Sequence, residues 1–258
     1  MFIDLHNHSV YSYDSTRNME RIITEAIEKN LSVLGFSDHL DFNQNDPGNE
    51  YYNGYSQFRE FNALKEKYSS KIKLLLGIEA SLEKSSEEKI RNTFSKFSFS
   101  YKIISAHFIQ KTVISNWVFE KEKTAKNIDE VDYSPYFKAL NDIADFDDYD
   151  ILGHIDYYKK YSKFIDHKQI FEKHIDDYRN ILKKVINSGK IIEINSSGLR
   201  HKCIEQFPSV FILELYKELG GKTVATGSDS HKVGDVAFDF KTVYNIIEEN
   251  KLKIFNPK

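Results

Sequence analysis

Short apolar runs rich in β-branched residues alternate with longer amphipathic stretches along this chain, and this alternation restricts the fold more than any other feature. The pattern is typical of successive βα units, in which each parallel strand is followed by a helix. Seven runs are predicted as strands, beginning near Phe2, Ser32, Ile72, Tyr101, Asp150, Lys190 and Lys222. No linker or repeat divides the 258 residues, so we expect one α/β domain over residues 1–258, a length that admits a barrel.

The stretches between these runs carry helical periodicity. From Asn18 to Lys29, apolar residues recur at the spacings that place them on one helical face, and Asn18 is a suitable N-cap. Further helices are predicted over residues 55–68, 85–97, 136–146, 167–187, 208–219 and 238–250. Segments 41–54 and 108–134 show no clear period, so we expect long loops there that contribute to substrate specificity.

Composition and the chain's N-terminal residues exclude several classes of protein. Lys and Arg number 36 against 39 Asp and Glu, a formal charge of −3, which lacks the basic excess expected of a protein that binds long nucleic acid through its phosphates. The start, MFIDLHNHS, has no signal-peptide pattern, and no apolar stretch approaches the roughly eighteen residues of a membrane span. The single Cys203 cannot form an internal disulfide, so we expect a cytoplasmic protein without a membrane segment.

Side chains able to bind metal ions lie at the C-terminal ends of the predicted strands. In a parallel barrel these ends open on one face, where the βα loops build the active site. His6 and His8 are two residues apart, as are Asp229 and His231, so each pair points to one side of an extended chain. Glu79 follows a buried apolar run, where a carboxylate needs a partner to offset its desolvation. Further candidates at strand ends are Asp38, His39, His107 and His154.

Each of these motifs is weak evidence when taken alone. An isolated HxH pair is usually coincidental, and a lone histidine after an apolar run is more often hydrogen-bonded in the core than bound to a metal. The prediction of a metal centre therefore depends on the joint occurrence of such residues at successive strand ends.

The motifs HNHS with downstream Asp14, SDH, GIEAS, SAH, GHID and GSDSH occur in this order, each at a predicted strand end. The series resembles the polymerase and histidinol phosphatase (PHP) superfamily of metal-dependent phosphoesterases over nearly the whole chain. Within that superfamily, the chain length, GHID, and EINSSGLR followed by GSDSH are most similar to the stand-alone histidinol-phosphate phosphatases of histidine biosynthesis. The resemblance implies a distorted (β/α)7 TIM-like barrel.

The resemblance also implies three clustered divalent ions. By position, the first ion would be held by His6, His8, Glu79 and Asp229. Glu79 would bridge to the second ion, which would also be held by His107 and His154. The third ion would be held by Asp14, His39 and His231, although some relatives have a histidine in place of Asp14. Zn, Mn, Fe and Co all suit histidine and carboxylate ligands, so the sequence does not choose among them.

The charge of such a centre favours a phosphomonoester substrate. Three divalent ions bring about +6 and three carboxylates about −3, so about +3 remains for a phosphate dianion and a hydroxide to balance. With the resemblance, this predicts a phosphatase that hydrolyses L-histidinol phosphate to L-histidinol and inorganic phosphate. Two alternatives stay open: a phosphoesterase for nucleotides or short oligonucleotides, and a non-catalytic metal-stabilised scaffold module. The sequence leaves the oligomeric state undetermined.

Two arginines and one aspartate are predicted to act on the phosphate group. Arg200, after the sixth run, is the candidate phosphate clamp, because a guanidinium matches phosphate oxygens in a bidentate manner. Arg17 is a second candidate for substrate binding. Asp38, beside His39, is a candidate proton donor to the leaving group if its pKa is raised. The alternative role for Asp38 is to orient a ligand imidazole.

Three further residues are predicted to contact the substrate. Asn195 and Ser197 follow the sixth run, where they can donate hydrogen bonds at the barrel mouth. Trp117 lies in the long segment after the fourth run and is a candidate to cover the imidazole ring of the substrate. The alternative is that Trp117 packs into the protein as an anchor.

Overall fold

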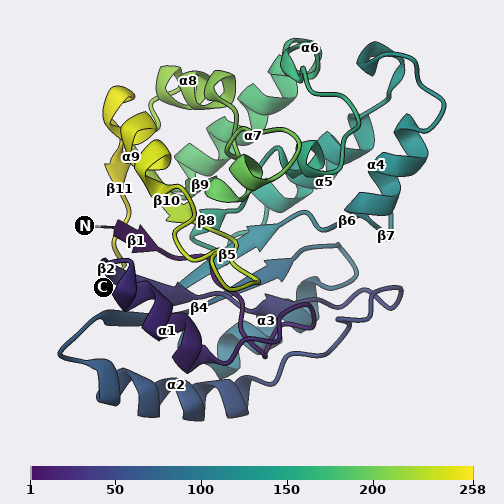
Figure 1. Cartoon of the computed structure of the whole chain (residues 1–258). Coiled ribbons are helices and arrows are strands. Elements are labelled where there is room, and N and C mark those ends of the chain that lie inside the picture. The colour runs from purple at the N-terminus through teal and green to yellow at the C-terminus, as the bar shows by residue number, and fades with distance from the viewer. Residues whose placement is uncertain (1, 258) are drawn as a thin grey trace.

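The seven predicted strands form one parallel sheet in the computed structural model, which describes residues 2–257. They are β1 (Phe2–Asp4), β2 (Leu31–Phe36), β4 (Lys73–Ser81), β5 (Tyr101–Ser105), β8 (Ile151–Leu152), β9 (Ile191–Asn195) and β10 (Thr223–Gly227). Their spatial order follows the chain, as expected when each strand is joined to the next by a crossover, and Figure 1 shows helices surrounding the sheet. The prediction of seven strands is therefore confirmed. Residues 1 and 258 of the predicted domain lie outside the described residues.

The sheet curls until its first strand meets β10. The backbone N–H of Leu5 donates to the carbonyl of Thr226 at 2.9 Å, and the N–H of His8 donates to the carbonyl of Ser230 at 2.9 Å. At the opposite end of β10, the short strand β11 (Lys253–Ile254) pairs with Thr223 and Val224. The closure is thus made by few hydrogen bonds at the carboxyl end of the strands, which gives the predicted distorted barrel.

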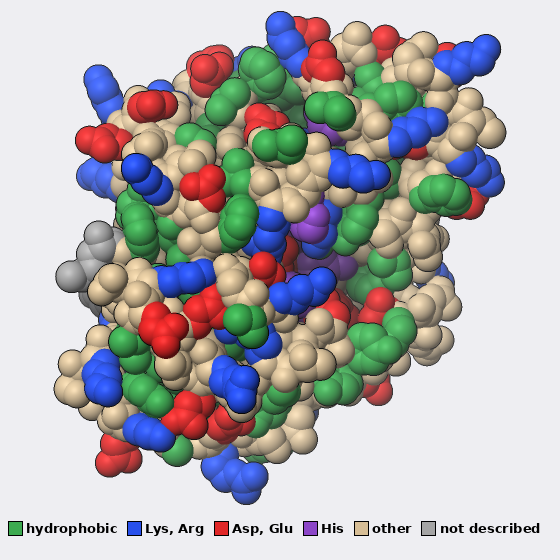
Figure 2. Space-filling model, viewed as in Figure 1, with side chains coloured by type: hydrophobic (Ala, Val, Ile, Leu, Met, Phe, Trp, Pro, Cys, Tyr) green, Lys and Arg blue, Asp and Glu red, His purple; other side chains and the backbone are tan. Residues whose placement is uncertain are grey.

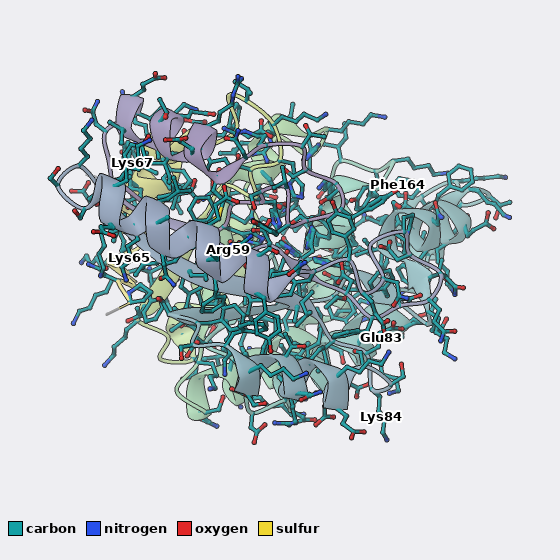
Figure 3. All side chains as sticks on the ribbon, turned by 90° about the horizontal axis from the view of Figure 1, so that it is seen from below. Arg59, Lys65, Lys67, Glu83, Lys84 and Phe164 are labelled. Atoms are coloured by element: carbon teal, nitrogen blue, oxygen red, sulfur yellow. The ribbon has the colours of Figure 1, made fainter. Side chains whose placement is uncertain are left out.

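Eight helices follow the amphipathic stretches: α1 (Met19–Glu28), α2 (Gly54–Tyr68), α3 (Glu87–Lys96), α5 (Ser134–Ala144), α6 (Lys168–Lys173), α7 (Ile175–Asn187), α8 (Val210–Glu218) and α9 (Phe240–Glu249). The side chain of Asn18 accepts a hydrogen bond from the N–H of Arg21 at 2.9 Å, which confirms it as the N-cap of α1. Figure 3 shows α1, α2 and α3 side by side along one side of the barrel, with Arg59 and Lys65 on α2. Within residues 2–257, none of the helices has the length and apolarity needed to cross a bilayer.

Two predictions about the connecting segments are wrong. The helix predicted over 167–187 is divided into α6 and α7 at His174, whose ring stacks on Phe137 with centroids 4.1 Å apart. Segment 108–134 is not one long loop. It contains a hairpin of β6 (Phe108–Ile109) and β7 (Thr112–Val113), the helix α4 (Ile114–Glu122) and the 3-10 helix η1 (Ile128–Glu130).

The helix α4 has a short apolar face, which explains why the sequence shows no clear helical periodicity there. Ile114, Trp117 and Val118 are buried at helical spacing, whereas Phe119 is exposed and the buried position 122 is a glutamate. Glu122 is accommodated because it accepts hydrogen bonds from the Tyr133 hydroxyl and from a backbone N–H. A search for periodic apolar residues does not recognise a buried glutamate as part of the helix's inner face.

The barrel interior depends on one large side chain packed against two glycines. A Cβ atom at Gly35 would lie 2.0 Å from the Tyr101 hydroxyl oxygen, and one at Gly77 would lie 2.4 Å from the Tyr101 ring. The Tyr101 hydroxyl donates a hydrogen bond to the carbonyl of Leu5 at 2.5 Å, so the ring also ties β5 to β1. The two glycines therefore create the space that the tyrosine fills.

We expect Gly77→Ala to lower the free energy of unfolding by about 1–3 kcal/mol, because the added methyl overlaps a ring that has no free space to move into. Urea unfolding followed by circular dichroism measures the change. In a Tyr101→Leu background the same Gly77→Ala substitution should cost less, since leucine leaves the overlapped volume empty. Equal costs in the two backgrounds would contradict the proposed packing.

Candidate metal centre

The structure brings the nine predicted ligand residues together at the carboxyl end of the strands. Figure 2 shows histidine side chains at the bottom of a hollow on this face, with Lys and Arg side chains at its rim. Six elements or their following loops supply these side chains, which is possible because parallel strands end at one edge of the barrel. The nine residues are His6, His8, Asp14, His39, Glu79, His107, His154, Asp229 and His231.

Glu79 Oε2 faces the first group of donors. It lies 3.2 Å from His6 Nε2 and 3.6 Å from His8 Nε2, while Asp229 Oδ1 lies 3.3 Å from His8 Nε2. His6 Nε2, His8 Nε2 and Glu79 Oε2 are buried and have no hydrogen-bond partner among the described residues. Buried polar atoms without partners are rare, and separations near 3.3 Å suit donors that surround one cation. These residues therefore fit a divalent ion.

Glu79 Oε1 faces the second group. It lies 3.2 Å from His107 Nε2 and 3.0 Å from His154 Nε2, and it accepts a hydrogen bond from the Ser105 hydroxyl at 2.6 Å. The two oxygens of one carboxylate thus face two different sets of imidazole nitrogens. This is the arrangement that a bridging carboxylate requires.

The third group lies at the mouth of the hollow. Asp14 Oδ2 is 3.0 Å from His231 Nε2 and 3.6 Å from His39 Nε2, and the two imidazole nitrogens are 3.4 Å apart. The Asp14 side chain is 51% exposed, in contrast to the fully buried Glu79. The third position is therefore the most accessible to solvent.

Hydrogen bonds on the outer nitrogens direct the inner nitrogens of two histidines into the centre. His6 Nδ1 lies 2.7 Å from Glu193 Oε1, which only accepts, so His6 Nδ1 carries the proton. His8 Nδ1 lies 3.0 Å from Ser12 Oγ, whose own proton is donated to Asp38, so His8 Nδ1 also donates. Nε2 of each ring therefore points into the centre, where it can bind a metal ion once it carries no proton.

Charge neutralisation keeps the central carboxylates ionised. Burial alone raises the pKa of Glu79, but the charges of His6 and His107 outweigh burial and hold this pKa well below its usual value. Burial likewise raises the pKa of Asp229, and the adjacent His8 imidazole with the charge of Lys160 outweighs burial and lowers it. Both groups are therefore anions at neutral pH.

Glu193 supports this centre and was missed in the sequence. It is almost fully buried, and its Oε2 accepts hydrogen bonds from the His154 N–H at 3.1 Å and from the Asn195 side chain at 3.0 Å. A Cβ atom at Gly227 would lie 2.0 Å from Glu193 Oε1 and 2.4 Å from His6 Cβ, so the glycine makes room for the pair. The available signal was a lone carboxylate within the apolar run KIIEIN.

Asp38 does not have the predicted role of proton donor. Its Oδ1 accepts hydrogen bonds from the Ser9 N–H at 2.5 Å and the Ser12 hydroxyl at 2.7 Å. Its Oδ2 accepts from the Ser9 hydroxyl at 2.8 Å and from Gln57 Nε2 at 2.5 Å. Burial does raise the pKa of Asp38, but the side chain is fully enclosed. Two cavities open beside the metal centre, and Asp38 lines neither of them. It anchors the loop after β1 instead.

The predictions that Arg17 and Trp117 bind substrate are also wrong. Arg17 is buried, and its guanidinium donates to the Ser230 hydroxyl at 2.9 Å and pairs with Glu25 at 2.5 Å. Trp117 is buried in the apolar core, with its ring 5.9 Å from that of Tyr133. Both side chains are buried against other protein groups, and neither lines the cavities.

Asn195 and Ser197 likewise face the protein interior. The Asn195 side chain accepts a hydrogen bond from the Ser197 N–H at 2.9 Å, which starts the 3-10 helix η3 (Ser196–Arg200), and it donates to Glu193. Ser197 is fully buried, and neither residue lines a cavity beside the centre. Their predicted contacts with substrate are therefore not supported.

Arg200 lines a cavity beside the third group, and it also holds the loop that carries Asp229. Its guanidinium donates to the carbonyls of Ser228 at 2.8 Å and Asp229 at 2.6 Å. Asp229 has a backbone φ of 51°, a left-handed conformation that costs energy in a residue other than glycine. Arg200 thus stabilises the strained turn that presents Asp229.

A cavity of about 500 Å³ lies beside the third group, and its lining includes three basic side chains together with the carboxylates of Asp14, Asp229 and Asp235. The basic side chains are Arg200, Lys160 and Lys232, and the last two were missed in the sequence analysis. Lys160 follows the GHID motif in the 3-10 helix η2 (Tyr157–Lys160), and its Nζ donates to the Tyr157 hydroxyl at 2.7 Å. Lysine and arginine side chains of this kind can donate charged hydrogen bonds to a phosphate group.

Comparison with known proteins identifies close relatives of this chain. The PHP domain matches residues 4–197. A probable histidinol-phosphatase from Clostridium acetobutylicum is 30% identical over 98% of this chain and 95% of its own length. A histidinol-phosphatase from Lactococcus lactis is 29% identical over 89% of this chain and 84% of its own. The crystal structure of histidinol phosphate phosphatase from Lactococcus lactis, in complex with zinc, L-histidinol and phosphate, superposes with a TM-score of 0.87 at 26% identity, covering 99% of this chain and 95% of that one.

Glu193 accepts hydrogen bonds from the His6 ring and from the backbone N–H of His154. We therefore expect Glu193→Gln to weaken metal binding by about 10–100-fold. The glutamine side chain keeps one oxygen, and its NH2 group takes the place of the other. One of the present donors to Glu193 would then face this NH2 group, which is itself a donor, and would lose its hydrogen bond. Competition with a chelator of known affinity measures the change, and circular dichroism verifies the fold. Glu214→Gln, an exposed carboxylate on α8, is the control and should bind metal as the wild type does. Unaltered metal affinity in Glu193→Gln would contradict this role.

Proposed function

The chain belongs to the PHP domain family, and on that premise we propose that it is a metal-dependent phosphatase that hydrolyses L-histidinol phosphate to L-histidinol and inorganic phosphate in histidine biosynthesis. The observation that carries this proposal is the arrangement around Glu79, whose two oxygens face separate sets of imidazole nitrogens. The relatives named histidinol-phosphatase, and the structure with zinc, L-histidinol and phosphate, support the choice of substrate.

The donor set accommodates three divalent ions. His6, His8, Glu79 and Asp229 would hold the first, Glu79 with His107 and His154 the second, and Asp14 with His39 and His231 the third. Zinc is the first candidate because the similar Lactococcus lactis structure contains it, while Mn, Fe and Co suit the same ligands. When bound, such ions lower the pKa of water towards neutrality and offset the charge that develops on the phosphoryl oxygens.

Three basic side chains of this chain would position the phosphate group. Lys160, Lys232 and Arg200 place positive charge around the cavity beside the third group, where the dianion of a phosphomonoester is attracted. The Tyr157 hydroxyl holds Lys160 in place, and two backbone carbonyls hold Arg200. Ordered cations of this kind favour a dianionic ester over a neutral one.

The remaining assignments follow from the same premise. The unpaired Cys203 suits a reducing compartment, and we assign the reaction to the cytoplasm. The substrate is a small phosphomonoester. Neither alternative from the sequence, a nucleotide phosphoesterase or a non-catalytic scaffold, has a specific observation in its favour.

Phosphate release from L-histidinol phosphate, compared with sugar phosphates and nucleotides, tests the proposal on protein whose metal content is measured in the same preparation. Selective turnover of L-histidinol phosphate with close to three metals per chain is expected. Full metal occupancy with turnover of nucleotides alone would show that the substrate is a nucleotide and not L-histidinol phosphate. Failure to bind any divalent ion would contradict the metal centre itself.

We expect Glu79→Gln to lower kcat by at least about 100-fold and to reduce the metal content, since a neutral amide cannot bridge two cations in a buried site. Metal analysis and phosphate-release kinetics measure both effects. Glu88→Gln, which changes an exposed carboxylate on α3, is the matched control and should resemble the wild type. Glu79→Gln protein with normal metal content and normal rate would exclude the bridge.

A further inference from the structure

Two consecutive lysines in η2 have opposite environments. Lys160 lines the cavity of about 500 Å³ beside the third group of ligands, whereas Lys159 is only 1% exposed. A 3-10 helix has three residues per turn, so side chains three positions apart lie on one face. Lys159 therefore shares a face with Asp156, to which it donates a hydrogen bond, and Lys160 shares a different face with Tyr157.

Lys159 is held by charged groups from two parts of the chain. Its Nζ donates to Asp156 Oδ2 at 3.0 Å and to Glu205 Oε2, in the loop after η3, at 2.5 Å. Asp156 Oδ2 also accepts a hydrogen bond at 2.9 Å from the N–H of Ser209, at the start of α8. Burial lowers the pKa of Lys159, but the charges of Asp156 and Glu205 outweigh burial and raise this pKa above its usual value. Lys159 is therefore a buried cation that joins η2 to the loop after η3.

The loop after η3 is itself fixed to the barrel. Phe207 and Asn195 exchange two backbone hydrogen bonds, of 2.6 and 2.9 Å, at the end of β9. A Cβ atom at Gly198 would lie 2.0 Å from the carbonyl oxygen of Glu205, so the loop packs closely against η3. The ring of Phe207 lies 5.8 Å from that of Tyr157, which brings the loop into contact with η2 as well. The loop is thus a fixed support for η2.

A buried ion pair is a costly way to join two segments. Removing two charges from water is unfavourable, and apolar side chains of similar volume often stabilise a fold equally well. The position of the next residue gives the pair a role other than stability. Lys160 Nζ donates its hydrogen bond within η2, to the Tyr157 hydroxyl, so the place of Lys160 at the cavity depends on where η2 lies.

We infer that Lys159 is a positioning residue for phosphate binding, which fixes η2 to the loop after η3 and so holds Lys160 at the cavity beside the metal centre. This role rests on the proposed phosphatase function, in which Lys160 donates to the phosphate group. Lys159 acts through its neighbour, because its own side chain is enclosed and lines neither cavity beside the centre.

The test removes both charges of the pair, because a single change would leave one of them buried and unpaired. In zinc-loaded Asp156→Asn/Lys159→Met, the Kd for inorganic phosphate measured by calorimetry should rise at least about tenfold, since a displaced charged donor contributes little. The Kd for L-histidinol, which has no phosphate group, and the metal content should match the wild type. Lys138→Met/Asp142→Asn, an exposed lysine–aspartate pair on α5, is the matched control and should bind both ligands as the wild type does.

A third substitution shows whether Lys159 acts through Lys160. Lys160→Met alone should also raise the Kd for inorganic phosphate at least about tenfold. When Asp156→Asn/Lys159→Met is added to it, the Kd should rise by less than about twofold more, because the positioned group is already absent. Fully additive losses would overturn the inference.

Glu205→Gln provides a milder variant. Its side chain is 31% exposed, so this change removes one charged contact of Lys159 and keeps the buried pair intact. The Kd for phosphate should rise about three- to fivefold, with L-histidinol unaffected. An unchanged Kd for phosphate in Asp156→Asn/Lys159→Met, or an equal loss for phosphate and L-histidinol, would refute the positioning role. If that double variant does not fold, the same two outcomes in Glu205→Gln decide the question.

These binding measurements separate the positioning role from the proposed reaction. If phosphate binding changes as expected while the wild type does not hydrolyse L-histidinol phosphate, the positioning role stands and the proposed reaction fails. If the wild type hydrolyses L-histidinol phosphate and the variants bind phosphate as it does, the reaction stands and the positioning role fails.

Discussion

The structure depends on one buried anion. Glu79 is fully enclosed, and an isolated carboxylate in such a place would cost several kcal/mol after relaxation. Imidazoles from different strands converge on its two oxygens at 3.0–3.6 Å and compensate much of that cost. A parallel barrel makes that convergence possible, since all strand ends meet at one face. The fold and the metal centre are therefore two consequences of the same strand arrangement.

Three other buried carboxylates hold the loops that carry the ligands. Asp4 accepts hydrogen bonds from the N–H groups of Ser228 at 3.0 Å and Ala237 at 2.8 Å, which ties the start of the barrel to the loop after β10. Asp38 fixes the loop after β1, and Glu193 fixes the His6 ring. Each of these groups accepts several hydrogen bonds, so its oxygens have partners within the protein. The ligand loops are consequently held in position by the protein's own hydrogen bonds.

The sequence predicted the strands and the convergence of the nine ligand residues because both depend on local rules. Apolar runs mark strands, and the end of a parallel strand has a known place in the barrel. The predictions for Arg17, Trp117 and Asn195 failed for a different reason. Whether a polar or aromatic side chain is free to contact substrate depends on partners distant in sequence, such as Glu25 for Arg17, and no local pattern contains that information. The same limit hid Glu193, which reaches a histidine 187 positions away.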